Sequence, residues 1–313
     1  MKTSYINKLM VLSFLLVLGG GLSRSYAQQD SQYTQYMYNT QLVNPAYAGN
    51  RGVLSFNGIF RSQWVGLDGA PETLSFSLNT PVSDRVGLGL SFFNDEIGPS
   101  VESNIAMDFS YVLPMNDKGL NLALGLKGGI NVLNIDFDKL NIFDPGDPDF
   151  FENVENRISP IVGVGFFLHQ DDKWYLGVST PNLINTEHYD NSTSSTAEEE
   201  INGYLMGGYV FDLGINAKLK PAFLFKGVKG APLTLDLSAN FLFYERFILG
   251  AAYRYNNAVS GLAGFHIDHK VMIGYAYDHD TTELGNYNSG SHEFFIRFEL
   301  PTRKRRTVNP RFF

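Results

Sequence analysis

Hydrophobic and polar residues alternate along most of this chain with a period of two. Between Gly119 and Lys127, leucines at every second position alternate with small or polar residues. Because successive side chains of a β-strand point to opposite faces, this pattern predicts a strand with one apolar face and one small or polar face. Such an apolar face packs against a second sheet in a soluble sandwich, or contacts lipid in an outer-membrane barrel.

Fourteen segments combine this alternation with turn residues at their ends, and each is predicted to be a strand. They lie near residues 51–62, 72–80, 85–93, 101–113, 119–133, 158–168, 173–180, 201–211, 216–226, 233–243, 246–255, 259–267, 270–278 and 292–300. Several carry charges opposite the apolar face, as Asp236 and Arg254 do. The core of a sandwich excludes such charges, whereas the wet lumen of a barrel accommodates them.

The connections between these predicted strands alternate in length. The longer set comprises residues 63–71, 94–100, 135–157, 181–200, 227–232 and 279–291, and only the short connection at 256–258 breaks the alternation. Short periplasmic turns alternating with longer external loops are typical of outer-membrane barrels. The chain is therefore predicted to be all-β, a transmembrane antiparallel outer-membrane β-barrel of about 14 strands with periplasmic termini.

The sequence divides into four parts. Lys2 and Lys8 precede an uncharged, mostly apolar stretch that ends in Ser25-Tyr26-Ala27, as in a cleavable signal peptide. We expect a signal peptide over residues 1–27, a periplasmic N-terminal segment over 28–50, the barrel over 51–300 and a basic periplasmic tail over 301–313. The segment 28–50 is either a disordered lead-in or packs in the mouth or lumen of the barrel.

Composition and charge narrow the classes of function. The chain has 31 Gly, 25 Phe, 17 Tyr and no Cys, so hydrogen-bonded ladders and burial must hold the fold without disulfides. The net charge of −8 falls to −11 when the three cations of the signal peptide are removed, which argues against nucleic-acid binding.

The C-terminal tail departs from this acidic balance. It carries the five cations Arg303, Lys304, Arg305, Arg306 and Arg311 and no acid. A local excess of one charge indicates an interaction tail, and the alternative is that these residues lie near anionic lipid headgroups.

Residues suited to catalysis or cofactor binding do not form a recognisable constellation. The histidines lie at predicted strand ends or in loops, and the Gly-x-Gly pairs lie inside strands with no helix following, so neither a catalytic site nor a cofactor is expected. One acidic loop is a weak calcium candidate through Asp144, Asp147, Asp149 and Glu152. Their spacing does not match an EF-hand, which favours a solvated acidic loop.

Three motifs remain that carry no chemistry. An aromatic, amide-rich run at 33–39 leads into the Asn-Pro-Ala-Tyr-Ala-Gly sequence at 44–49, a compact loop at 61–71 contains Gln63 and Trp64, and the chain ends in an Asn-Pro-Arg-Phe-Phe sequence at 309–313. Together they resemble the PorP/SprF family of type IX secretion system outer-membrane proteins. The residues that carry the resemblance are Asn44, Pro45, Ala46, Tyr47, Gly49, Arg61, Gln63, Trp64, Gly69, Pro71, Thr73, Gly290, Ser291, His292, Glu293, Pro310 and Phe313.

This resemblance implies a non-enzymatic component of the bacterial outer membrane that supports export or surface anchoring of cargo proteins such as gliding adhesins. It also implies contacts with outer-membrane lipid, with periplasmic and outer-membrane components of the secretion machinery, and with the C-terminal domains of secreted cargo. Gln63, Trp64 and the cations of the tail are the partner-binding candidates. The residues alone leave open an alternative from another class, an outer-membrane channel for fatty acids or other small solutes.

Overall fold

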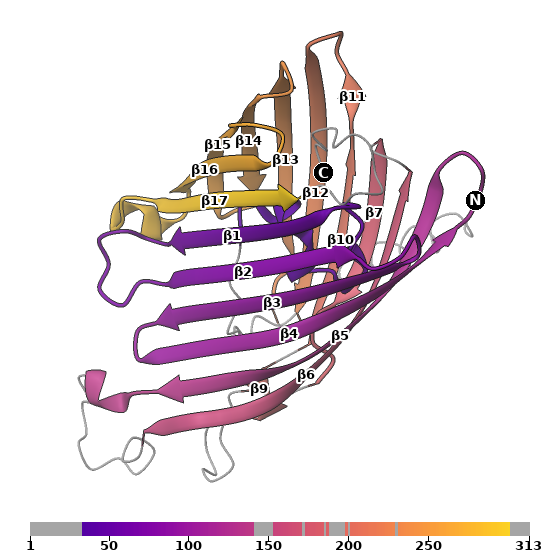
Figure 1. Ribbon diagram of the computed structural model, residues 1–313. Coiled ribbons are helices and arrows are strands. Elements are labelled where there is room, and N and C mark those ends of the chain that lie inside the picture. Colours follow the sequence, from indigo (N-terminus) through magenta and orange to yellow (C-terminus); the bar gives the residue numbers. More distant parts are fainter. Residues whose placement is uncertain are drawn as a thin grey trace, which may run out of the picture.

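Alternating residues build the wall of a closed barrel in the computed structural model, which describes residues 33–140, 153–170, 173–184, 186–187, 198–199, 201–228 and 231–300. Within these ranges, fourteen antiparallel strands form the barrel (Figure 1). Each strand pairs with its neighbours in sequence, β1 pairs with β17, and β10 pairs with β12. Among the helices that the structure describes, none is long and apolar enough to cross a membrane.

The barrel strands agree with the predicted ones to within a few residues at most ends. They are β1 (Leu54–Ser62), β2 (Glu72–Pro81), β3 (Val86–Ile97), β4 (Ser100–Pro114), β5 (Leu120–Ile135), β6 (Val154–Gln170), β7 (Trp174–Thr180), β10 (Asn202–Tyr209), β12 (Ala217–Val228), β13 (Thr234–Phe243), β14 (Phe247–Arg254), β15 (Ala258–His266), β16 (Val271–Asp280) and β17 (Ser291–Leu300). A short hairpin of β8 (Thr186–Glu187) and β9 (Glu198–Glu199) and the two-residue β11 (Phe211–Asp212) were not predicted.

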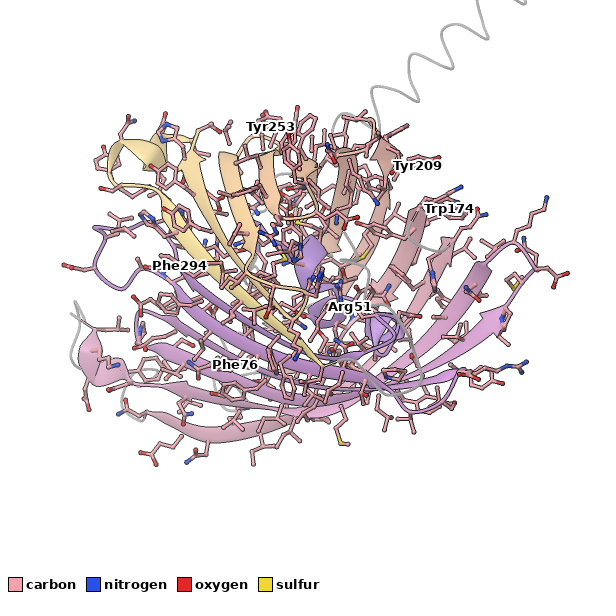
Figure 2. All side chains as sticks on the ribbon, turned by 45° about the horizontal axis from the view of Figure 1, so that its top comes forward. Arg51, Phe76, Trp174, Tyr209, Tyr253 and Phe294 are labelled. Carbon is pink, nitrogen blue, oxygen red and sulfur yellow. The ribbon has the colours of Figure 1, made fainter. Side chains whose placement is uncertain are left out.

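The two faces of the wall have the reverse of a soluble protein's polarity. On β5, the side chain of Leu126 is 59% exposed on the outer face, whereas Lys127 beside it is buried and faces the lumen. Figure 2 shows the same division, with Phe76 on the outer wall and Arg51 inside the barrel. Exposed apolar side chains outside and buried polar ones inside are the arrangement that a lipid surround requires. The leucine ladder of β5 therefore faces lipid.

The connections lie at two rims, which we name by their lengths. The short-turn rim carries the turns at 82–85, 115–119, 244–246 and 267–270, and the long-loop rim carries the connections at 63–71, 136–153, 181–201 and 281–290. The predicted loop over 94–100 is wrong, because β3 continues to Ile97 and β4 begins at Ser100, which leaves a two-residue turn. The alternation of lengths therefore fails at this turn as well as at 256–258.

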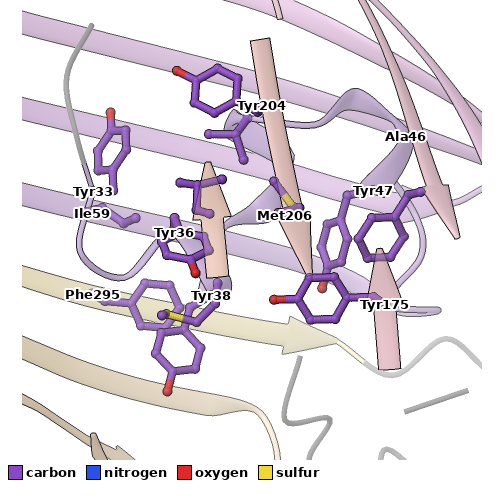
Figure 3. Close-up of a cluster of buried hydrophobic side chains, with 14 of the residues drawn as sticks. Tyr33, Tyr36, Tyr38, Ala46, Tyr47, Ile59, Tyr175, Tyr204, Met206 and Phe295 are labelled. Carbon is purple, nitrogen blue, oxygen red and sulfur yellow. The ribbon is translucent and has the colours of Figure 1, made fainter. Parts of the chain in front are cut away.

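Residues 33–53, called here the N-terminal segment, lie inside the barrel. They form three 3₁₀ turns, η1 (Tyr36–Tyr38), η2 (Thr40–Leu42) and η3 (Pro45–Tyr47), and most of their side chains are buried. The main cluster of buried apolar residues joins these turns to inward-facing residues of the wall, as Figure 3 shows for the tyrosines of the segment beside Met206 and Phe295. The apolar core of the protein is thus built in the lumen, around its own N-terminal segment.

The two ends of the described chain lie at opposite rims. Leu300 ends β17 at the short-turn rim, where the predicted topology puts both termini. Thr34, by contrast, hydrogen-bonds to Asp278 and Glu293, which lie close to the ends of β16 and β17 at the long-loop rim. The chain reaches this position because the N-terminal segment runs along the lumen before entering β1.

Candidate functional site

A buried ion cluster fixes the N-terminal segment near the long-loop rim. Arg61 of β1 pairs with Asp278 of β16, with its Nη2 atom 2.7 Å from Oδ2, and with Glu293 of β17, with its Nη1 atom 3.0 Å from Oε2. The segment completes this Arg61 cluster. The backbone N–H groups of Thr34 and Gln35 donate to the two oxygens of Glu293 at 2.9 and 2.8 Å, and the Thr34 hydroxyl donates to Asp278 at 2.6 Å.

The charges of the Arg61 cluster explain why the segment is held there. Arg61 and Glu293 are direct neighbours in the register of β1 and β17, and both side chains are almost completely buried. Two carboxylates share one guanidinium, so the cation alone does not supply enough donors for the carboxylate oxygens. A buried carboxylate that lacks hydrogen-bond donors is costly, and the N–H groups of Thr34 and Gln35 supply them.

A second cluster lies toward the short-turn rim. The Nε atom of Arg51, at the end of the segment, is 2.5 Å from Oε1 of Glu299 on β17. Arg297, also on β17, donates to the backbone oxygen of Tyr38 and, at 3.0 Å, to the side chain of Asn57. The Tyr38 ring lies close to two cations, with its centroid 5.3 Å from Nζ of Lys220 and 5.9 Å from Cζ of Arg297. This Arg51 cluster ties both the middle and the end of the segment to β17.

Strands β3 and β5, which lie beyond β2 from the Arg61 cluster, hold the segment through glycines. At Gly125 of β5, a side-chain carbon would lie 2.1 Å from the backbone nitrogen of Ala46, and at Gly87 of β3 it would lie 2.1 Å from the backbone oxygen of Ala48. Such separations are far below van der Waals contact, so only glycine lets the segment lie against these strands. We call Gly87, Gly125 and the lumenal face around them the glycine wall.

The Asn-Pro-Ala-Tyr-Ala-Gly sequence is the part of the segment that docks on the glycine wall. The side chain of Asn44 accepts a hydrogen bond from the Ala46 N–H at 3.0 Å, which caps the 3₁₀ turn η3, and donates to the backbone oxygen of Phe166 at 3.0 Å. The ring of Tyr47 packs edge-on against that of Phe167, with centroids 5.4 Å apart. These family-motif residues therefore face the interior of the barrel.

The first loop, at 63–71, packs against the last one at the long-loop rim. The N–H of Trp64 donates to the Ser291 hydroxyl at 3.2 Å, and the N–H of Val65 donates to the oxygen of Gly290 at 2.9 Å. Trp64 has a φ of 46°, a left-handed conformation that is unusual for a bulky residue. The motifs around Gln63 and around Gly290 are thus brought together, and Gln63 and Trp64 stay predictions as partner-binding residues.

Other motif residues have local contacts. The oxygen of Gly69 accepts from the N–H of Gly98 at 3.0 Å, and Pro71 is buried and accepts from the N–H of Gln63 at 2.9 Å. Nδ1 of His292 lies 2.7 Å from the Tyr275 hydroxyl on the outer face. These contacts connect the ends of neighbouring strands and loops.

Several predicted site residues lie outside the described residues. They are the calcium candidates Asp144, Asp147, Asp149 and Glu152, the basic residues Arg303, Lys304, Arg305, Arg306 and Arg311, and the motif residues Pro310 and Phe313. Within the part of the chain that the structure describes, no three His, Asp or Glu side chains lie close enough together to hold a metal ion.

Sequence reasoning did not identify the two ion clusters. The alternation put Glu293, Arg297 and Glu299 on the inward face of a strand, but it assigned them no partners. Thr34 and Arg51 lie in a segment without periodicity, and their partners are more than 240 residues away in the chain. The available signal was an excess of inward-facing charges on one strand.

A family comparison gives this arrangement its biological setting. The family described as "Type IX secretion system membrane protein PorP/SprF" matches residues 25–298. The chain belongs to this family. This PorP/SprF protein is therefore an outer-membrane component of the type IX secretion system, and both Arg61 and the 44–49 motif lie within the matched range.

Solved structures with a similar barrel are distant in sequence. Omp33 of Acinetobacter baumannii is 9% identical, with a TM-score of 0.47, over 79% of this chain and 99% of that one. A FadL homologue of Pseudomonas aeruginosa is 12% identical, with a TM-score of 0.41, over 79% of this chain and 89% of that one. A comparison with curated proteins found no match.

Proposed function

We propose that this PorP/SprF protein has no enzymatic activity and supports export or surface anchoring of cargo proteins, such as gliding adhesins, through contacts at its two rims. The observation that carries this proposal is the filled lumen. Residues 33–53 occupy it and are held by two ion clusters and by the glycine wall. A barrel filled in this way is a rigid mount for its loops and termini, and it is poorly suited to passing solutes.

The strength of the filling argues against the alternative of a diffusive channel for fatty acids or other small solutes. Opening the lumen would separate Arg61 and the carboxylates of Asp278 and Glu293 from the segment that completes their hydrogen bonds. It would also expose the buried rings of Tyr36 and Tyr38. Water would replace the lost hydrogen bonds of the charged groups, but exposing apolar surface costs about 25 cal/mol per Å², so the filled state is favoured.

The two rims suit different partners. The connections at 136–153 and 181–201 join strands at the long-loop rim. Together with the loop of Gln63 and Trp64, they are the expected contacts for the C-terminal domains of cargo. The basic tail follows β17 at the short-turn rim and is the expected contact for an acidic periplasmic component. Several cations in a short tail steer an acidic partner electrostatically, and salt weakens that attraction.

Affinity purification of the full-length protein from native outer membranes tests the proposed function. We expect secretion-system components and cargo to be recovered with it. A variant lacking residues 302–313, and a full-length variant with Arg303, Lys304, Arg305 and Arg306 changed to Gln, should both lose the periplasmic component and keep the cargo. Recovery without any component of the machinery would overturn the proposal. Unchanged recovery from both tail variants, with the barrel inserted, would overturn only the role of the tail.

Conductance in planar bilayers separates secretion support from solute passage. We expect the purified wild-type protein to show no steady conductance, because the N-terminal segment fills the lumen. A large, steady conductance of the wild type would favour the channel alternative instead.

A further inference from the structure

From its last residue to its first, the N-terminal segment contacts the wall at positions farther and farther from the short-turn rim. Its last residues lie near the short-turn rim, where Arg51 pairs with Glu299, one residue before the end of β17. Gly49 lies against Pro81 and Gly87, which flank the turn between β2 and β3 at the same rim. The C-terminal end of the segment therefore lies at the short-turn rim.

The middle of the segment crosses the lumen at intermediate depth. The Asn39 side chain accepts a hydrogen bond from Ser77, inside β2, at 2.7 Å. Asn44 reaches Phe166 of β6, and the oxygen of Val43 accepts from Ser179 of β7 at 2.7 Å. These partners lie four to five strands apart around the barrel, so the segment crosses the lumen between them.

The first described residues lie close to the long-loop rim. Thr34 hydrogen-bonds to Asp278 and to Glu293, each two residues from the long-loop end of its strand. The Tyr33 ring lies 6.5 Å from that of Phe93, four residues before the long-loop end of β3. At about 3.3 Å of rise per residue, Glu293 is about 7 Å from the long-loop end of β17 and about 23 Å from its other end.

We propose that the N-terminal segment threads the barrel, so that the N-terminus of the mature chain emerges at the long-loop rim, opposite the C-terminal tail. Predicted cleavage after Ala27 leaves five residues before Tyr33. Five extended residues span at most about 18 Å, which is enough for the short distance to the long-loop rim and too little to return along the wall. A return path would also have to pass the tyrosines and ion clusters that fill the lumen.

This topology gives the protein an element of its own chain at both rims without an open channel. The residues ahead of Tyr33 are rich in amides and include Asp30, and the mature chain begins with an amino group. Their polar character suits the proposed exit from the lumen into water. The inference depends on the path of residues 33–53 and on the predicted cleavage after Ala27, and it is independent of which partners the protein binds.

Single-cysteine labelling tests the topology, because the natural chain contains no cysteine. Three matched variants replace an aspartate: D30C ahead of the segment, D68C in the first long loop and D84C in the turn between β2 and β3. Asp68 and Asp84 are exposed. A membrane-impermeant maleimide is added to intact cells, to lysed cells and to denatured protein.

We expect D30C to be labelled under the same conditions as D68C, and D84C under the opposite ones. The result is read against the two controls, so it does not depend on which rim faces the cell exterior. Labelling of D30C together with D84C would overturn the proposal, since the N-terminus would then share a rim with the short turns. Labelling of D30C only after denaturation would also overturn it, since the N-terminus would then be enclosed in the lumen.

Discussion

The two walls of the lumen hold the same segment by different chemistry. On the wall formed by β1, β16 and β17, Arg61 and Arg51 connect it through charge-assisted hydrogen bonds. On the glycine wall, the backbone around Ala46 lies directly against Gly125, so close packing decides the fit at this point, and Gln41 adds a hydrogen bond to Asp108, which pairs with Lys127. At the charged wall, removing one partner leaves a buried charge without its counter-charge. At Gly87 and Gly125, adding a side chain would cause a collision with the segment.

This difference shows how a wide barrel can be filled by a short segment. On one side, charged side chains of the wall bind the backbone of the segment at Thr34 and Gln35. Glycines bring the segment close on the other side, so that no large gap remains. Because the two walls depend on opposite properties, substitutions on each should fail in distinguishable ways.

The largest effect is expected from R61M on the charged wall. It leaves Asp278 and Glu293 buried without their cation, which should lower the free energy of unfolding by about 3–5 kcal/mol. Urea unfolding of the folded barrel in detergent measures this loss, and protease sensitivity of residues 33–53 reports whether the segment is released.

The double variant R61M/E293Q is the control for charge. Removing one of the two stranded carboxylates should recover part of the lost stability. If E293Q instead lowers the stability of R61M by as much as it lowers that of the wild type, the two residues act independently. That result would contradict the ion cluster as the cause of the loss.

A smaller loss is expected from G125A on the glycine wall. The added carbon would meet the backbone of Ala46, so the segment or the strand must shift, at a cost of about 1–3 kcal/mol. The matched control is G128A on the same strand, since Gly128 has open space around its side-chain position. Equal stabilities of the two variants, measured by urea unfolding, would show that the close approach at Gly125 does not matter.

A milder change in the part of the segment that docks on the glycine wall is N44A. This change removes the cap of η3 and the hydrogen bond to Phe166, and it should cost about 1 kcal/mol. Unfolding should remain cooperative, with the segment still protected from protease. Loss of protection equal to that of R61M would mean that the two walls act as a single unit.

The smallest effect is expected outside both walls, at Asp268 in the turn between β15 and β16. The N–H groups of Lys270 and Val271 donate to this carboxylate at 2.7 and 2.8 Å and hold its pKa below the ordinary value. A carboxylate with a depressed pKa stabilises the fold at neutral pH, and this contribution is lost as the pH falls through the folded-state pKa.

The variant D268N keeps an oxygen acceptor and removes the titration. Its unfolding midpoint should therefore vary less than that of the wild type as the pH is lowered from neutral through the carboxylate range. An identical pH profile for the two proteins would contradict a role of this turn in acid sensitivity. It would not bear on the contacts of either lumenal wall.

The strands could be predicted because the side chains of each strand alternate between lipid and lumen, and its residues alternate in polarity accordingly. In β5, β13 and β14 every second side chain faces lipid, so the alternation is visible within about ten residues. The turn at Gly98 could not be placed from the sequence, because the polar residues at 94–96 are typical of a loop. In the structure they continue β3 past Phe93.

The filling of the lumen could not be predicted in the same way. Residues 33–53 lack periodicity, and their stability comes from contacts with strands far away in sequence. Arg61 illustrates the limit: as a motif residue it was singled out, but only the register of β1 with β17 shows that it faces Glu293. Gly87 belongs to one of the Gly-x-Gly pairs inside the predicted strands, and nothing in the sequence indicates its contact with the backbone of Ala48.

The Arg61 cluster also has a consequence for the order of assembly. Thr34 donates to side chains that follow it by 244 and 259 residues, so its hydrogen bonds cannot form until the last two strands are present. Contacts between such distant parts of a chain form slowly, because the loop they close is long. The residues that leave the ribosome early are therefore among the last to be secured, and the seam between β1 and β17 closes around them.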